Sequence, residues 1–149
     1  MKVSIRSTYG IMAAVDLAMQ PDSAPVQAKS IARRQGIPAR FLEQVLHGMK
    51  KAGLVSSLRG AQGGYVLSKK PSELSIAEIL DALDGPFLAV AGLNGQNPLR
   101  PMPKSDALLA KVWNRVYEAE RHVLEAITVE ELAGQQRQLE EQRTLMYHI

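Results

Sequence analysis

Apolar residues recur every three or four positions along most of this chain, and that spacing predicts a mainly helical fold. Only two short runs, which lie in the first half, look like strands. Ser7 or Thr8 is the candidate cap of the first helix, and Ser75 is the candidate cap of the fourth. The predicted helices cover residues 7–19, 28–35, 39–52, 74–83, 105–127 and 128–133.

The two strand-like runs, LVSSL and GYVL, lie within residues 54–67 and are joined by a glycine-rich turn. Gly60, Gly63 and Gly64 supply the backbone freedom that the tip of a tight hairpin needs. Arg59 lies in the same turn, where it has few apolar neighbours, so the pattern predicts that it points to something outside the fold. A basic helix followed at once by a basic hairpin is typical of a winged helix-turn-helix that binds DNA.

The helices predicted over residues 28–35 and 39–52 are joined by a short turn, which is helix-turn-helix spacing. One face of the second helix is apolar, with Phe41, Leu42, Val45, Leu46 and Met49, and the other face is polar. On the polar face, Gln44 could pair with an adenine edge and Glu43 could accept from a cytosine amino group. An ordinary solvated helix face is the alternative. The candidate DNA-contacting residues of this pair are Arg33, Arg34, Arg40, Glu43, Gln44, His47 and Lys50.

Charge is distributed unevenly along the 149 residues, although the net charge is only +3. Residues 1–70 carry a net charge of +8, and residues 71–149 carry −5. A basic half of this density indicates a polyanionic partner, with a solvated basic face as the alternative.

The chain contains no cysteine. Disulfides, thiolate catalysis and cysteine-ligated metal or iron–sulfur sites are therefore excluded, and no cofactor is expected. The composition fits a cytoplasmic protein. No stretch is long and apolar enough to cross a membrane.

Residues 105–127 form the longest periodic segment, with apolar residues at spacings of three and four over about three heptads, the seam pattern of a coiled coil. Because a small winged helix does not need this length for its own core, the segment predicts a dimerisation helix. Trp113 and Leu108, with Leu124 and Ile127, widen the apolar face and are expected to pack on the DNA-binding unit. The alternative is a long core helix within one protomer. The seam residues are Leu109, Val112, Val116, Ala119 and Val123.

The remaining segments complete the domain plan. Residues 1–84 form the winged helix-turn-helix domain, 85–104 an irregular loop, 105–133 the dimerisation helix with a short following helix, and 134–149 a polar tail. The tail is expected to be mobile or frayed until its apolar end, where Tyr147, His148 and Ile149 are candidates for binding a partner. A terminus folded back on the dimerisation helix is the alternative.

Three stretches carry a family resemblance: STYGIMAAVDLA, SIARRQGIPARFLEQVLHGMKKAGLVSSLRGAQGGYVLSK and LSIAEILDALDGP. Together they resemble the bacterial winged helix-turn-helix regulators of the Rrf2 family, over roughly residues 1–130. The resemblance implies a homodimeric transcription regulator on a partly palindromic operator, with Arg59 entering the minor groove and Thr8 and Tyr9 contacting the DNA backbone. Further DNA-binding residues implied by the same match are Glu43, Gln44, Ser57, Gly60, Gly63, Gly64 and Tyr65.

The chain departs from the cluster-binding members, which carry three cysteines in the segment that here reads LAVAGLNGQNPLRPMPKSD. The iron–sulfur role is therefore not carried over, and the cluster-free, CymR-like branch is the better match. That branch represses genes of cysteine metabolism together with cysteine synthase. Partners of that enzyme place a C-terminal isoleucine in its active site, so Ile149 is the implied anchor, flanked by Tyr147 and His148.

Two function classes remain open from the sequence. The first is a dimeric DNA-binding repressor, and the second is an interaction protein that binds a metabolic enzyme through its tail and has little DNA-binding role. An enzyme is not indicated, because no nucleophile–base pair or phosphate-binding loop is present.

Overall fold

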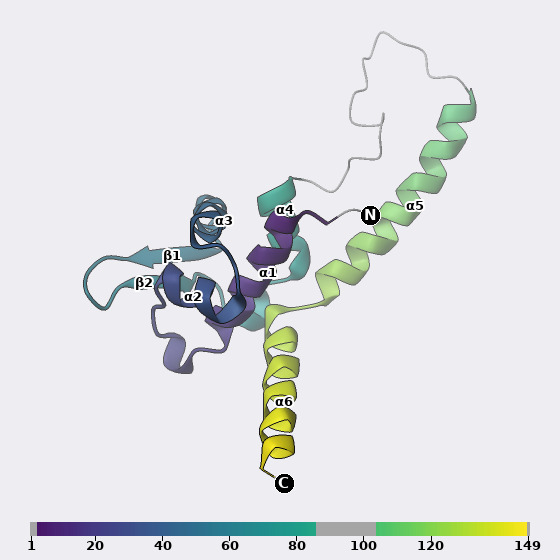
Figure 1. The fold of residues 1–149 in the computed structure, drawn as a ribbon. Helices are drawn as coiled ribbons and strands as arrows, with labels where there is room; N and C mark the ends of the chain where they lie inside the picture. Colours follow the sequence, from purple (N-terminus) through teal and green to yellow (C-terminus); the bar gives the residue numbers. More distant parts are fainter. Residues whose placement is uncertain (1–2, 86–103, 149) are drawn as a thin grey trace.

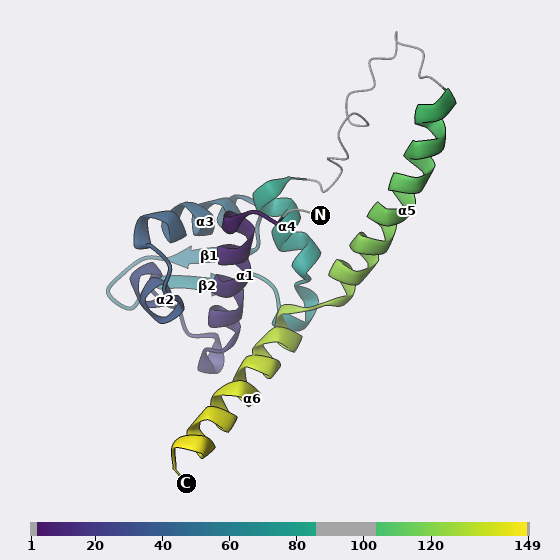
Figure 2. The same ribbon diagram turned by 45° about the vertical axis from the view of Figure 1, so that its right-hand side comes forward.

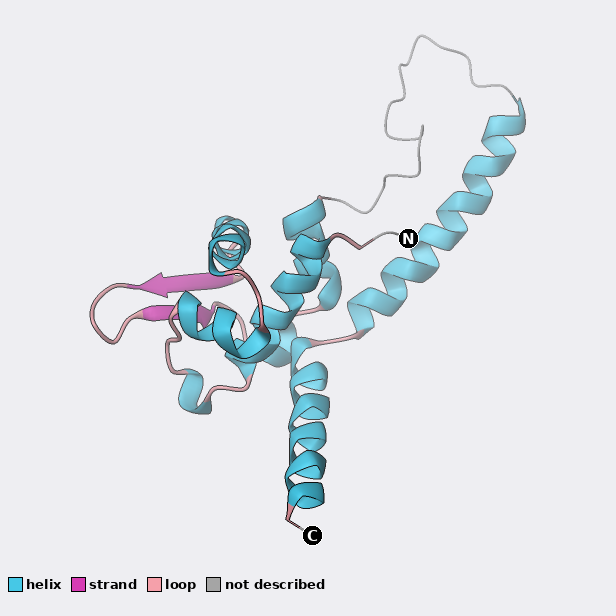
Figure 3. Cartoon of the chain, in the orientation of Figure 1, coloured by secondary structure: helices cyan, strands magenta, loops and turns pink. Residues whose placement is uncertain are grey.

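The computed structural model describes residues 3–85 and 104–148. Within them the chain is mainly helical with one antiparallel hairpin, which confirms the predicted fold class (Figures 1 and 3). The elements are α1 (Ile5–Ala18), η1 (Pro21–Ser23), α2 (Ala28–Gln35), α3 (Ala39–Lys51), β1 (Val55–Leu58), β2 (Gly64–Leu67), η2 (Pro71–Glu73), α4 (Ile76–Asp84), α5 (Lys104–Ala126) and α6 (Val129–Tyr147).

Helix α1 lies at the centre of the fold, where α2, α3, α4 and the first half of α6 pack around it. Gly10 lets α4 come close, because a Cβ at this position would lie 2.3 Å from Cδ1 of Leu83. Burial of the apolar side chains of several helices in one core stabilises the domain. The largest fully buried apolar side chains are Ile31, Leu42, Val45, Leu46, Met49, Val55, Leu74, Ile79, Leu80 and Val129.

The start of α1 differs from the prediction. Ser4, rather than Ser7 or Thr8, caps the helix, and its hydroxyl accepts a hydrogen bond from the Ser7 amide at 3.1 Å. Ser7 is fully buried and donates to Oδ2 of Asp84 at 2.7 Å, so its hydroxyl joins α1 to the end of α4. The predicted cap Ser75 is confirmed, and with Glu78 it forms a capping box on α4.

Helices α5 and α6 leave the domain in opposite directions, with the hairpin on the side away from α5 (Figures 1 and 2). The helix predicted over residues 128–133 is longer than expected, because α6 continues through residues 134–147, the segment expected to be mobile or frayed. Gln, Glu, Arg and Leu are good helix formers, and Thr128 caps the first turn. Of the predicted loop at residues 85–104, residues 86–103 lie outside the described part of the chain.

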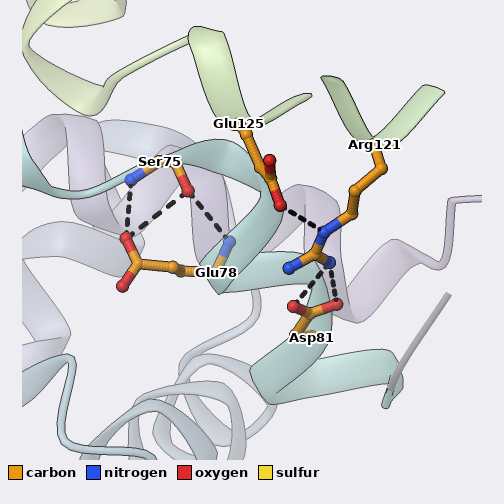
Figure 4. A network of polar contacts seen from close by, with 5 residues as sticks. All are labelled: Ser75, Glu78, Asp81, Arg121 and Glu125. Atoms are coloured by element: carbon orange, nitrogen blue, oxygen red, sulfur yellow. Dashed lines mark hydrogen bonds and ion pairs between the residues drawn. The ribbon is translucent and has the colours of Figure 1, made fainter. Parts of the chain in front are cut away.

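A polar network joins the inner end of α5 to α4 (Figure 4). Arg121 bonds Asp81 of α4 at 2.7 Å and Glu125 of its own helix at 2.7 Å. The hydrogen bonds that Arg121 donates to both carboxylates raise its pKa. The other end of α5 makes no such contact among the described residues: Leu108 and Trp113, which were expected to pack on the domain, are 67% and 45% exposed.

Candidate nucleic-acid interface

Helix α3 presents the predicted polar face to solvent. Gly36 ends α2 in the left-handed region with φ +66°, and the buried Ile37 follows it in the turn. Four predicted stripe residues, Leu42, Val45, Leu46 and Met49, are buried, and Phe41 is half-buried. Since these five occupy one face of α3, its candidate DNA-contacting residues lie on the opposite face. They are Arg40, Glu43, Gln44, His47 and Lys50, all of which are exposed.

The hairpin of β1 and β2, called the wing here, is held to the domain at its base. A bridge pairs Val26, in the segment before α2, with Tyr65: each amide donates to the other residue's carbonyl, at 3.0 and 2.7 Å. Val26 therefore pairs with β2 through a single β-bridge beside the two-stranded sheet. The sequence prediction missed it, since a single extended residue leaves no periodic signal. Tyr65, a candidate DNA contact, is half-buried within this base.

The tip of the wing projects from the domain. Arg59 and Gly60 are exposed there, and Gly60 has φ +111°, in the region that favours glycine. Gly63 is buried in the turn, where a Cβ would lie 2.1 Å from the Leu58 carbonyl oxygen. A side chain at position 63 would therefore change the path of the chain next to Arg59.

A direct contact joins α3 to the wing. Nζ of Lys50 donates to Oγ of Ser57 at 2.7 Å, and both residues are exposed. The contact joins the end of α3 to β1, so that the exposed polar face of the helix lies next to the wing. The structure thus brings together the two elements that the sequence analysis assigned to DNA.

The two candidates on α1 have different surroundings. Thr8 is exposed, and its hydroxyl donates to the Ser4 carbonyl at 3.1 Å. Tyr9 is half-buried and meets Phe41 of α3 in a T-shaped contact with ring centroids 5.5 Å apart. The ring of Tyr9 therefore packs against α3 from the side of α1.

The two arginines of α2 also differ. Arg33 is exposed, whereas Arg34 forms a two-point ion pair with Asp16 of α1: Nε lies 3.0 Å from Oδ2, and Nη2 lies 2.7 Å from Oδ1. This hydrogen bonding raises the pKa of Arg34. The guanidinium of Arg34 is thus paired with a buried carboxylate of the domain, although the side chain itself is exposed.

We expect the wing to be sensitive to Gly64→Ala. Gly64 has φ +152°, and a Cβ there would lie 2.5 Å from the backbone of Val26, which cannot move without breaking the bridge. The variant should lose about 1–3 kcal/mol of unfolding free energy in urea titrations. The matched control is Gly134→Ala in α6, where a Cβ has open space and should add about 0.5–1 kcal/mol. Equal stability of the two variants would contradict this account.

The remaining candidates lie on α5 and α6. Leu109, Val112, Val116, Ala119 and Val123 are all exposed on α5. Tyr147 and His148 are exposed at the outer end of α6, and Ile149 lies outside the described residues. In the described ranges, no helix is long and apolar enough to span a membrane. The same ranges contain no group of three or more His, Asp or Glu side chains that could hold a metal ion.

Comparisons with known proteins agree with this geometry. The family model Rrf2, described as "Iron-dependent Transcriptional regulator", matches residues 3–135. The HTH-type transcriptional regulator CymR of Bacillus subtilis (strain 168) is 34% identical over 134 residues, which cover 90% of this chain and 91% of the relative. Such relatives are regulators, which confirms that this chain is not an enzyme.

Two solved structures have the same fold. One is titled as the structure of CymR (YrzC), the global cysteine regulator of B. subtilis; it has a TM-score of 0.74 and 31% identity, and the match covers 90% of this chain and 97% of that one. The other, IscR of T. potens, has a TM-score of 0.72 and 34% identity, with 91% and 88% covered.

The family description names iron, whereas this chain contains no cysteine. With no cysteine in the chain, the residues do not fit a cysteine-ligated iron–sulfur cluster. The winged helix-turn-helix, the exposed face of α3 and the match over residues 3–135 nevertheless agree, and the chain belongs to the Rrf2 family of DNA-binding transcriptional regulators.

Proposed function

We propose that the chain is a homodimeric repressor that reads a palindromic operator with α3 and the wing. The observation that carries this proposal is the joined surface of α3 and the wing, held by the contact between Lys50 and Ser57. A helix of this kind enters the major groove, which carries the base-edge pattern that tells all four base pairs apart. Because the target is chromosomal DNA, the proposed place of action is the cytoplasm.

The exposed residues of α3 divide into two roles by position. Glu43 and Gln44, near the amino end, are placed to read base edges, Glu43 by accepting from cytosine and Gln44 by pairing with adenine. Arg40 precedes these two residues on the same face, and His47 and Lys50 follow them; all three are assigned to phosphates, as is Arg33 on α2. Thr8 is assigned to the backbone as well.

The wing is assigned to the minor groove. Arg59 is exposed at its tip, with no ion pair or hydrogen bond described for its side chain. A narrow minor groove has a strongly negative potential that attracts an inserted arginine. Ser57, Gly60 and Gly63 shape the approach of the wing backbone, and Tyr65 supports its base.

The homodimer is supported by the apolar seam on α5. Leu109 and Val112 are each 51% exposed, Val116 is 46% exposed and Val123 is 56% exposed. A core helix within one protomer would bury these side chains, whereas a second α5 would cover them at coiled-coil spacing. Two copies of α3 related by a two-fold axis would then face two half-sites.

We extend the proposal to cysteine metabolism because one solved relative is described as a global cysteine regulator. Genome-wide binding of the tagged protein, with and without sulfur limitation, tests this assignment. We expect enriched sites upstream of sulfur-metabolism genes and a change in occupancy between the two conditions. Binding sites unrelated to those genes would contradict a role in cysteine metabolism without contradicting the DNA-binding role.

The proposed partner that carries the signal is cysteine synthase. Helix α6 supports this by extending away from the domain, with Tyr147 83% exposed at its outer end (Figure 1). Ile149 would enter the active site of the enzyme, where its carboxylate takes the place of the substrate carboxylate, with Tyr147 and His148 as flanking contacts. Recognition of a free terminal carboxylate is a known mode of peptide capture.

We expect a peptide of the last ten residues to bind cysteine synthase and to compete with its substrate in a steady-state inhibition assay. Deletion of Ile149 should weaken binding at least about tenfold, because the anchor and its carboxylate are displaced. The control is the same peptide with a C-terminal amide, which keeps the side chains and loses the charge. If the peptide binds cysteine synthase with the same affinity after deletion of Ile149, the proposal of this partner is wrong.

A further inference from the structure

The ion pair between α1 and α2 is buried on one side only, at the carboxylate of Asp16. The side chain of Asp16 is 3% exposed, and that of Arg34 is 43% exposed. Both carboxylate oxygens of Asp16 accept from Arg34, in the two-point geometry that fixes orientation as well as distance. Asp16 therefore lies inside the domain, where it has no access to a nucleic acid.

Two further amides bind the same carboxylate. Nε2 of Gln35 donates to Oδ2 at 3.0 Å, and Nε2 of Gln20 lies 3.5 Å from Oδ1 and 3.0 Å from the Asp16 carbonyl. A buried charge is tolerated when it is paired and hydrogen-bonded in this way. Arg34 and Gln35 are the last two residues of α2, so one carboxylate holds the whole end of that helix.

The end of α2 leads directly to α3. Gly36 turns the chain, the Ile37 amide donates to the Ala32 carbonyl at 2.9 Å, and the Pro38 carbonyl accepts from Leu42 at 3.0 Å. Only residues 36–38 separate the held helix end from the exposed face of α3. A rotation of the end of α2 about α1 would therefore move the first turns of α3, where Glu43 and Gln44 lie.

The geometry points to Asp16 and Arg34 as positioning residues for DNA recognition: the ion pair between the buried Asp16 carboxylate and Arg34 sets the angle at which α3 meets the major groove. Arg34 acts through α2 instead of contacting a phosphate. This inference rests on the proposed role of α3. It replaces the sequence-based assignment of Arg34 to DNA with a role inside the domain.

Asp16→Asn separates a positioning role from a direct contact with DNA. Because Asp16 cannot touch DNA and the substitution makes the protein more positive, neither a lost contact nor lost charge would explain weaker binding. The probes are an operator duplex selected with the wild-type protein and a scrambled duplex of equal composition, titrated by fluorescence anisotropy at several salt concentrations well below the melting temperature. We expect the operator affinity to fall about tenfold, with the affinity for scrambled DNA and the salt slope unchanged. A misplaced α3 loses contacts to base edges, whereas the number of contacts to phosphates stays the same.

Arg34→Lys is the second variant, which keeps the charge and loses the two-point geometry, and its operator affinity should fall in the same direction. A lower melting temperature with both affinities unchanged would show that the pair only stabilises the fold. A phosphate contact by Arg34 would give a different pair of results. Asp16→Asn would then bind both duplexes more tightly, and Arg34→Gln would bind both more weakly, with a salt slope lower by about one per protomer. Either result overturns the inference.

Hydrogen exchange of the DNA-free protein tests whether Asp16 positions α3 without any DNA being bound, so its outcome does not depend on the proposed function. Backbone amides of residues 39–44 should exchange faster in Asp16→Asn than in the wild type, while those of α4 keep their rates. Unchanged exchange at residues 39–44 would overturn the inference even if the operator is bound as proposed. A wild-type protein that binds the operator and scrambled DNA equally would refute the proposed function. If residues 39–44 still exchange faster in Asp16→Asn, the ion pair of Asp16 and Arg34 positions α3 even so.

Discussion

Arg59→Ala should weaken binding to the operator roughly 10- to 100-fold, with little change in the unfolding midpoint. The side chain is exposed at the tip of the wing and supports nothing within the domain, so its loss removes a DNA contact without disturbing the core. The affinity is measured by anisotropy on the operator duplex, and thermal unfolding is followed by circular dichroism.

The matched control for this experiment is Arg143→Ala. Arg143 is exposed on the outer half of α6, so the variant loses the same charge far from α3 and the wing. It should bind the operator nearly as the wild type does, and any small loss should disappear as salt is raised. Equal weakening by the two substitutions would show that Arg59 contributes only to the net charge.

Val116→Glu should convert the protein into a monomer and lower its operator affinity at least about 100-fold. Val116 lies in the middle of the apolar seam of α5, and two glutamates meeting there would be desolvated and would repel each other. Sedimentation velocity gives the oligomeric state, and anisotropy gives the affinity for full and half operators.

Asn114→Glu is the control for the dimer experiment. Asn114 is exposed on the face of α5 away from the seam, so the same new side chain there should leave the dimer intact. A Val116→Glu protein that remains dimeric would place the interface elsewhere. A monomer that binds a full operator as tightly as the wild type would show that dimerisation is not needed for recognition.

The elements with a strong hydrophobic period were predictable from the sequence. Helices α2 and α3, the hairpin and the capping residue Ser75 are found where the pattern predicts them. Each is determined by local signals: a stripe of apolar residues, a glycine with a positive φ, or a side chain that caps a helix.

The features that the sequence did not reveal depend on long-range contacts. Val26 joins the wing through one bridge, and Arg34 is drawn inward by a carboxylate 18 residues away. On sequence alone, Asp16 only interrupts an apolar run. The helix beyond Gly134 was missed because its residues are polar on all sides, so no apolar stripe marks it.

We propose that two copies of α3 and the wing read an inverted repeat. Selection of the full-length protein on a pool of random duplexes, followed by anisotropy across a salt series, tests it most directly. We expect one enriched inverted repeat, with half-sites about one helical turn apart or a multiple of it, bound with an affinity that falls steeply with salt. Enrichment of no sequence, or of a single site without two-fold symmetry, would contradict it.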